Sequence, residues 1–141
     1  MLYSRTAKYA VLALAEIANR ESEQPISTRV IASATEVPYA LLAKIIGQLR
    51  RAGLVDASRG KLGGIRLARP ARDIAVWDVV EAIDGRGLLE DCPLYLKPCR
   101  CERECSLHSI WKHARDAVAD FLENTSLADV AVARRGLEEP E

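Results

Sequence analysis

The fold class follows from residues 27–69, which read STRVIASATEVPYALLAKIIGQLRRAGLVDASRGKLGGIRLAR. Apolar residues recur at helical spacing in two short blocks, one after Ser27-Thr28 and one from Pro38 to Leu49. A hydroxyl residue suits a helix N-cap, and proline suits the first helical position, where its missing N–H costs nothing. Thr35-Glu36-Val37 separates the two blocks as a tight turn. This pattern predicts a helix-turn-helix whose second helix stops at Gly53.

A basic hairpin is predicted directly after this helix pair. Residues 54–59 and 65–69 alternate between apolar and polar side chains like two strands, and the glycine-rich segment 60–64 between them supplies the permissive backbone of a hairpin loop. A helix-turn-helix followed by a hairpin with cations at its tip is typical of a winged helix. DNA is the partner that such a module binds.

Helical patterns also flank the winged segment. A first helix is expected from Ser4 to Asn19, and a short amphipathic helix from 75 to 84, which Gly85 ends. The chain from Arg86 to Glu104 shows no periodicity. Helical spacing then resumes in a strongly apolar stripe from Leu107 to Leu122, which predicts pairing with the same helix of a second chain. The alternative is that this helix folds back onto its own domain.

The expected architecture is therefore mainly α: a winged helix-turn-helix with a small β-hairpin wing and a long C-terminal dimerisation helix. Residues 1–84 are expected to form the DNA-binding domain, 85–105 a cluster-binding loop, and 106–130 the dimerisation helix with the segment after it. Residues 131–141 are expected to form a tail, whose last six residues are acidic and frayed.

Composition and charge narrow the class of protein. The 141 residues are 49% hydrophobic and 28% charged, which excludes a wholly disordered chain, and no apolar run approaches the roughly 20 residues of a membrane span. The N-terminus lacks a signal-peptide pattern, so we expect a cytoplasmic protein. The net charge of zero hides a segregation, with 12 Lys and Arg against 5 Asp and Glu in residues 1–72, and 8 against 15 in residues 73–141. The basic half favours a polyanionic partner on one face.

All four cysteines lie between positions 92 and 105, and His108 follows closely. Four thiols and an imidazole within 17 residues suit one metal centre. A disulfide framework is the main alternative, but a cytosolic address keeps thiols reduced. Zinc sites usually bring their ligands as close pairs, and the uneven gaps here suit an iron–sulfur cluster better. No phosphate loop or nucleophile motif is present, so we expect neither an enzyme nor a small-molecule substrate.

The chain resembles the IscR and NsrR family of bacterial winged-helix regulators over nearly its whole length. The motifs that carry this resemblance are Lys8-Tyr9-Ala10, Leu41-x2-Lys44, Ala52-Gly53-Leu54-Val55, Arg59-Gly60, Gly63-Gly64 and Ile74-x3-Asp78-Val79-Val80. The resemblance implies that Cys92, Cys99 and Cys105 are cluster ligands, with His108 as the fourth in the IscR-like arrangement. It also implies a 2Fe-2S cluster, with a 4Fe-4S cluster as the alternative.

Two of the departures from the family pattern bear on the ligand set. Cys101 has no counterpart in it and is an alternative ligand or a partner in a disulfide after cluster loss. NsrR-like members take an acidic ligand from the first helix of the other subunit, and the comparable position here is Lys8, which cannot ligate while charged. This difference favours the IscR-like ligand set.

The resulting interpretation is a homodimeric, cluster-sensing transcriptional regulator, most simply a repressor, that binds a palindromic operator in double-stranded DNA. The residues expected to contact DNA are Thr28, Tyr39, Lys44 and Arg50 of the helix pair and Arg59 and Lys61 of the wing. Three alternatives stay open: a zinc-bound winged-helix repressor, a thiol–disulfide switch without a cluster, and an iron–sulfur carrier or electron-transfer protein.

Overall fold

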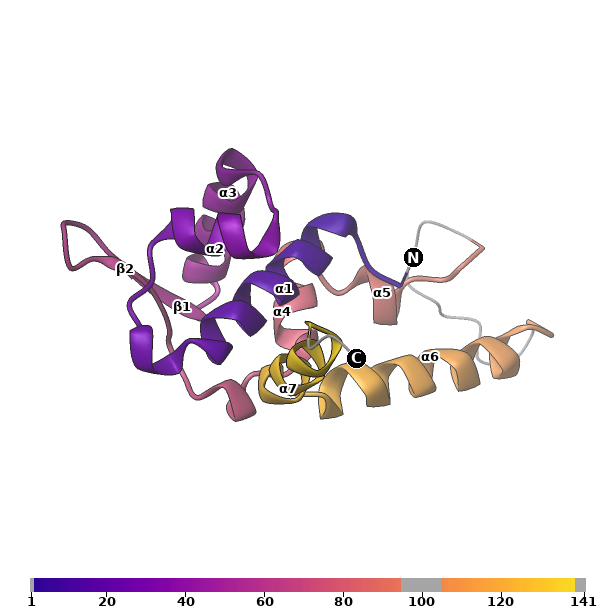
Figure 1. The fold of residues 1–141 in the computed structure, drawn as a ribbon. Coiled ribbons are helices and arrows are strands. Elements are labelled where there is room, and N and C mark those ends of the chain that lie inside the picture. The colour runs from indigo at the N-terminus through magenta and orange to yellow at the C-terminus, as the bar shows by residue number, and fades with distance from the viewer. Residues whose placement is uncertain (1, 95–104, 139–141) are drawn as a thin grey trace.

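The computed structural model describes residues 2–94 and 105–138. Its elements, in chain order, are α1 (Arg5–Asn19), the 3-10 turn η1 (Glu21–Glu23), α2 (Thr28–Thr35), α3 (Tyr39–Arg51), β1 (Val55–Ser58), β2 (Gly64–Leu67), the 3-10 turn η2 (Ala71–Asp73), α4 (Val76–Asp84), α5 (Gly87–Glu90), α6 (His108–Asn124) and α7 (Leu127–Glu138). The wing and α6 extend from opposite sides of the remaining helices (Figure 1). The mainly α winged-helix fold expected from the sequence is thereby confirmed.

The helix-turn-helix forms where the local signals predict it. The Ser27 hydroxyl caps α2 by accepting a hydrogen bond from the backbone N–H of Val30 at 3.3 Å. The helix ends at Thr35, and the left-handed backbone of its C-cap residue Glu36 (φ 57°) reverses the chain. Pro38 occupies the N-cap position of α3, so this helix starts at Tyr39, one residue later than predicted. The difference is within the usual ambiguity of a helix end.

Helix α1 lies at the centre of the molecule and contacts α2, α3, α4 and α7. Its buried face carries Ala7, Ala10 and Ala13, which are fully buried, and these small side chains let the neighbouring helices approach closely. Large aliphatic side chains fill the space around them, each contributing roughly 1.5–3 kcal/mol through burial. The largest of these fully buried side chains are Leu14, Ile17, Ile31, Leu42, Ile45, Leu49, Ile74, Leu122 and Leu127.

The wing is attached to the body by a third stretch of extended chain. Strands β1 and β2 pair antiparallel, with Val55 opposite Leu67 and Ser58 opposite Gly64. Ile26, just before α2, exchanges two backbone hydrogen bonds with Ile65 of β2, at 2.9 and 2.7 Å. The base of the wing is therefore fixed to the start of the helix-turn-helix.

The segment after α4 is less irregular than the sequence suggests. Gly85 ends α4 with a positive φ of 76°, as predicted, but residues 87–90 then form the short helix α5. Four residues are too few to show a helical period in the sequence, which explains why this turn was not predicted.

The C-terminal residues are helical, contrary to the expected tail. Helix α7 continues to Glu138 and includes residues 131–138, and it packs along α1. Leu127 and Ala131 are buried, so the helix contributes to the core. The prediction failed because apolar residues of α7 lie on its exposed side, as Val132 does, as well as on its buried side, and this weakens the periodic signal. The division of the chain into domains stays a prediction.

Among the described residues, no single helix has the length and hydropathy to span a membrane. Helices α2 and α3 meet those criteria only when taken together, across a bend of 116°.

Candidate DNA interface and cysteine segment

The predicted DNA-contacting residues lie on three consecutive elements. Thr28 is the first residue of α2 and is half-buried, whereas Tyr39, the first residue of α3, is 51% exposed. Lys44 lies in the middle of α3 and Arg50 in its last turn, and both side chains are exposed. The opposite side of α3 is buried against the core through Leu42, Ile45, Ile46 and Leu49. This amphipathic division leaves the polar face of α3 turned outward.

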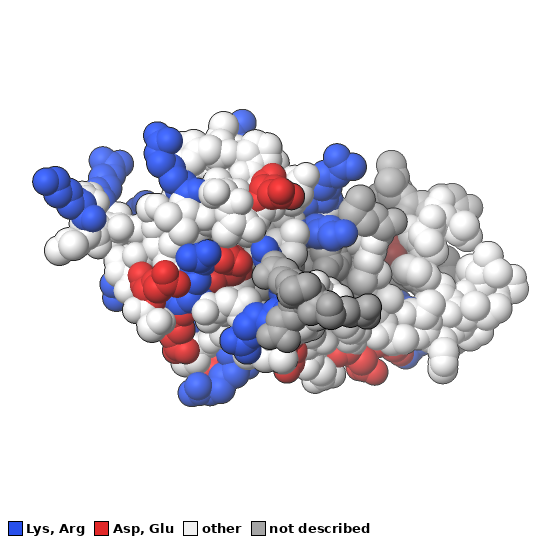
Figure 2. Space-filling view, in the orientation of Figure 1, with Lys and Arg blue, Asp and Glu red and all other residues white. Residues whose placement is uncertain are grey.

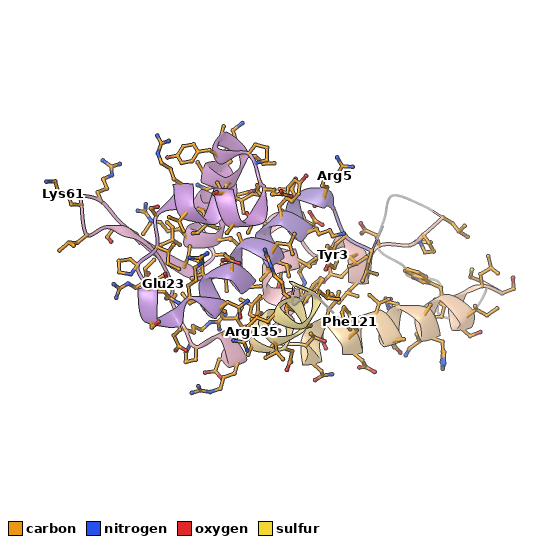
Figure 3. The ribbon with its side chains drawn as sticks, in the orientation of Figure 1. Tyr3, Arg5, Glu23, Lys61, Phe121 and Arg135 are labelled. Atoms are coloured by element: carbon orange, nitrogen blue, oxygen red, sulfur yellow. The ribbon has the colours of Figure 1, made fainter. Side chains whose placement is uncertain are left out.

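The wing presents its cations at a tight turn. The backbone N–H of Gly63 donates to the carbonyl of Gly60 at 3.0 Å, which makes Lys61 and Leu62 the two central residues of the turn. Arg59 precedes the turn, and Arg59 and Lys61 are both exposed. Lys61 lies at the far tip of the hairpin (Figure 3). The hairpin therefore carries positive charge outward from the body, as the sequence predicts.

These cations lack acidic partners in the described part of the chain. Arg20, Arg86, Lys112 and Arg134 all form ion pairs with carboxylates, at 2.5 to 3.6 Å. Within residues 2–94 and 105–138, no ion pair involves Lys44, Arg50, Arg59 or Lys61. Figure 2 shows Lys and Arg side chains projecting from the wing and from the helices beside it. Cations without internal partners are available to bind phosphate.

One cation that the sequence analysis missed also belongs to this surface. The guanidinium of Arg29, in the first turn of α2, lies over the ring of Tyr39 with its central carbon 5.3 Å from the ring centroid. Both side chains are exposed. Positions 29 and 39 are ten residues apart and belong to different helices, so no local pattern indicates this contact.

The cysteine segment is described only in part. Cys92 and Cys105 are free thiols of intermediate burial, and His108 is the first residue of α6. The backbone N–H of His108 donates to the carbonyl of Cys105 at 3.1 Å, so this thiol and this imidazole belong to one turn. Cys105 therefore lies just before α6, and α7 follows α6 in the chain. Cys99 and Cys101 lie outside the described residues.

The donor types present suit an iron–sulfur cluster. Thiolates and imidazole are the side chains that hold such clusters. Trp111, one turn beyond His108, has a buried indole Nε1 with no hydrogen-bond acceptor among the described residues. Within those residues, no three His, Cys, Asp or Glu side chains gather at one point, so the structure does not bring Cys92 together with Cys105 and His108, the described part of the predicted ligand set.

Helix α6 exposes most of its predicted apolar stripe. Only Leu122 is fully buried, through the contact of α6 with α4, and Val118 is partly buried. Five residues instead line an exposed face at alternating spacings of three and four residues. This face, here named the α6 seam, consists of Leu107, Ile110, Ala114, Ala117 and Phe121. The spacing is that of the core positions of a two-stranded coiled coil.

Comparisons with known proteins agree with this architecture. A family model, Rrf2, described as an iron-dependent transcriptional regulator, matches residues 3–133. The HTH-type transcriptional repressor NsrR of Streptomyces coelicolor is 30% identical, over 94% of this chain and 91% of that protein.

Two solved structures share the fold closely. CymR of B. subtilis, described as the global cysteine regulator, has a TM-score of 0.78 at 28% identity, covering 92% of this chain and 95% of that one. IscR of T. potens has a TM-score of 0.76 at 27% identity, covering 98% and 91%.

Proposed function

The chain belongs to the Rrf2 family of transcriptional regulators, and on this premise we propose that it is a homodimeric repressor that senses iron–sulfur status, redox state or nitric oxide. Family membership makes it a DNA-binding regulator and not an enzyme. It also removes the alternative of an iron–sulfur carrier or electron-transfer protein. The proposal concerns the residues that bind DNA, the assembly, and the signal.

The exposed, unpaired cations of α3 and the wing carry the DNA-binding part of the proposal. Helix α3 enters the major groove, with Thr28, Tyr39 and Lys44 near base edges or flanking phosphates and Arg50 at the backbone. Arg59 and Lys61 reach the adjacent minor groove or its phosphates. In this arrangement the acidic C-terminal half stays away from the DNA.

The α6 seam supports the homodimer. An isolated helix gains little by exposing an apolar row at coiled-coil spacing, whereas two copies bury it against each other. A two-fold dimer binds a palindromic operator whose half-sites are separated by about 34 Å or a multiple of it.

Cys92, Cys99, Cys105 and His108 are the residues proposed to hold an iron–sulfur cluster, with Cys101 as an alternative ligand. A 2Fe-2S cluster is favoured and a 4Fe-4S cluster is the alternative. When bound, such a cluster supplies sensitivity to oxidants, nitric oxide and iron supply. His108 begins α6, so its ligation links the cysteine segment to the helix that carries the dimer seam. We infer that a change at the ligands alters the spacing of the two α3 helices.

A thiol switch is the second candidate function. The similarity to CymR, a cysteine regulator, favours it, as do the free thiols of Cys92 and Cys105. In this version oxidation joins two cysteines of residues 92–105 in a disulfide, and a reductant restores the thiols. A zinc-bound repressor is the remaining alternative.

Anaerobic purification followed by a visible spectrum, with iron and acid-labile sulfide assays on the same sample, tests the cluster. We expect charge-transfer bands with matching iron and sulfide, lost in Cys105→Ala and retained in Cys101→Ala. A colourless protein with stoichiometric zinc establishes the zinc repressor. A colourless, metal-free protein whose DNA affinity changes reversibly on oxidation establishes the thiol switch.

DNA binding of the loaded and cluster-free forms tests the coupling. The cluster-free Cys92→Ala protein is expected to lose affinity for at least some operators of the loaded protein. If Cys92→Ala binds every such operator with unchanged affinity, the proposed coupling is wrong.

A further inference from the structure

The geometry points to Arg29 as a specificity-determining residue, which holds the ring of Tyr39 in one orientation at the start of α3 and binds a DNA phosphate with its remaining donors. This inference rests on the proposed DNA-binding mode of α3. It concerns a stacked pair on two helices, here named the Arg29–Tyr39 pair. The family resemblance and the comparisons do not include it.

Arg29 has no stabilising role in its own helix. It occupies the first turn of α2, where the positive end of the helix dipole disfavours a cation. The cap of α2 is supplied by the Ser27 hydroxyl instead. Among the described residues, Arg29 takes part in no ion pair and no side-chain hydrogen bond, and the contact recorded for its guanidinium is the ring of Tyr39. Its position is therefore explained by the ring or by a ligand outside the chain.

The turn between the helices brings the two residues together. Glu36 reverses the chain with a left-handed backbone, Val37 is buried at 2% exposure, and Pro38 limits the backbone just before Tyr39. These three residues place the start of α3 beside the first turn of α2. The juxtaposition thus results from a rigid turn and a buried anchor.

Stacking leaves the functional groups of both side chains available. A guanidinium over a ring uses its flat face, so its N–H donors still point outward in its plane and can bind a phosphate. The Tyr39 hydroxyl, at the far end of the ring, can donate or accept at a base edge. An exposed tyrosine would otherwise sample several rotamers, and ordering it before DNA binding improves discrimination between sequences.

The variant Arg29→Lys separates the two proposed roles of Arg29, which are ordering the Tyr39 ring and binding a DNA phosphate. Arg29→Lys keeps the positive charge but loses the planar group. The probes are a duplex that the wild-type protein selects from a random pool and a scrambled duplex of the same composition. On the scrambled duplex, Arg29→Lys is expected to keep the wild-type salt dependence, whereas Arg29→Ala lowers the slope of log affinity against log salt by about 1.

The ratio of affinities for the two duplexes reports specificity. We expect Arg29→Lys to lower this ratio about tenfold and Tyr39→Leu, which also removes the hydroxyl, to lower it at least as much. The double variant is expected to lower it no further than Tyr39→Leu alone, because Arg29 acts on specificity through the ring that this change removes. Tyr39→Phe keeps the ring, so Arg29→Lys is expected to lower the affinity ratio in the Tyr39→Phe background as well. Arg51→Lys is the matched control: Arg51 is an exposed cation at the end of α3, outside the proposed DNA contacts, and its substitution is expected to leave the ratio unchanged.

The inference is overturned if Arg29→Lys keeps the wild-type ratio, or if the effects of Arg29→Lys and Tyr39→Leu add. Thermal unfolding of each variant checks that both exposed substitutions leave the fold intact. A wild-type protein that selects no duplex above background contradicts the proposed DNA-binding mode itself. The two failures are thereby distinguishable.

Discussion

Gly64 shows how a single residue fixes the wing to the body. A Cβ built on Gly64 would lie 2.7 Å from the backbone carbon and oxygen of Ile26, the residue that pairs with Ile65. Backbone atoms cannot move aside as the end of a flexible side chain can. The glycine is therefore required by the close approach of the two backbones.

Gly64→Ala should lower the free energy of unfolding by about 2 to 3 kcal/mol, because the added methyl group forces Ile26 and β2 apart. Chemical denaturation measures this loss. Gly136→Ala is the matched control, since a Cβ at this position in α7 meets nothing within 4 Å. It should stabilise the protein by up to about 1 kcal/mol, as alanine is the better helix former. Equal effects of the two substitutions would show that the approach to Ile26 is not what requires glycine.

Only those residues of the candidate site that have a local sequence signal could be predicted from the sequence. Lys61 follows from the sequence because a glycine-bounded turn places its central residues outward whatever surrounds it, and Arg59 directly precedes that turn. Arg29 does not, because its relevant neighbour, Tyr39, belongs to another helix. A search for cations beside the predicted helix start at Ser27-Thr28 would have included Arg29 but could not have assigned its partner.

At the scale of the element, α7 depends on a reciprocal cap at its N-terminus. The Ser126 hydroxyl accepts a hydrogen bond from the backbone N–H of Asp129 at 3.1 Å, and the Asp129 carboxylate accepts from the backbone N–H and the hydroxyl of Ser126, each at 2.9 Å. The backbone and side-chain hydrogen bonds from Ser126 lower the pKa of Asp129 below its usual 3.8.

This lowered pKa predicts an acid-sensitive helix. The contribution of Asp129 to stability is fully present above the unfolded pKa and is lost as the pH falls through the lower folded pKa. Asp129→Asn should therefore melt at a lower temperature than the wild type at about pH 6, and the difference should shrink as the pH falls below the unfolded pKa and through the lower folded pKa. Calorimetry over this pH range measures it. A difference that stays constant would mean that ionisation of Asp129 does not matter to the cap.

The element α6 shows that periodicity identifies a helix without saying what covers it. Its stripe of apolar residues was correctly predicted, but one helix end packs on α4 while the seam stays exposed. Folding back on its own domain therefore describes the end of this helix that contacts α4, and pairing of the seam with a second chain stays a proposal. The α7 error has a different cause, since the apolar residues of that helix do not mark one face, yet the helix packs on α1.

At the scale of the whole molecule, Arg134 joins three helices. From α7 its guanidinium donates to the carbonyl of Leu12 in α1 at 3.3 Å and to that of Ala34 in α2 at 3.2 Å. It also lies 3.6 Å from the carboxylate of Glu16, which is the only buried charged residue among those described. Arg134 thus connects the C-terminal helix α7 to α1 and to the first helix of the helix-turn-helix, α2.

Removing this connection should destabilise the protein. Arg134→Met keeps much of the side-chain volume but leaves two carbonyls without their donor, so we expect a loss of about 1 to 3 kcal/mol in the free energy of unfolding. Urea denaturation measures the loss. Arg135→Met, at the neighbouring exposed position, is expected to change stability by less than about 0.5 kcal/mol. Indistinguishable midpoints for the two variants would contradict the role of Arg134.

The proposed dimer can be tested at the same scale. Ile110 is 68% exposed at the α6 seam, and Val132 is 60% exposed on α7, outside the seam. Ile110→Glu should weaken dimerisation about 100-fold or more, because it would bury an unpaired carboxylate in the interface. Val132→Glu should leave the dimer intact. Sedimentation equilibrium measures both, and a dimer unaffected by Ile110→Glu would exclude the seam as the interface.

The sequence by itself determined the helices of the winged segment, the hairpin and the distribution of charge. Helical period, caps and turn residues depend on interactions between residues at most a few positions apart. A sequence pattern can predict interactions of this local kind. Only the tertiary structure decided that α7 packs on α1, that Gly64 meets Ile26, that Arg29 covers Tyr39 and that Arg134 spans three helices. Those contacts join residues distant in the chain, and their energy depends on how whole elements pack together.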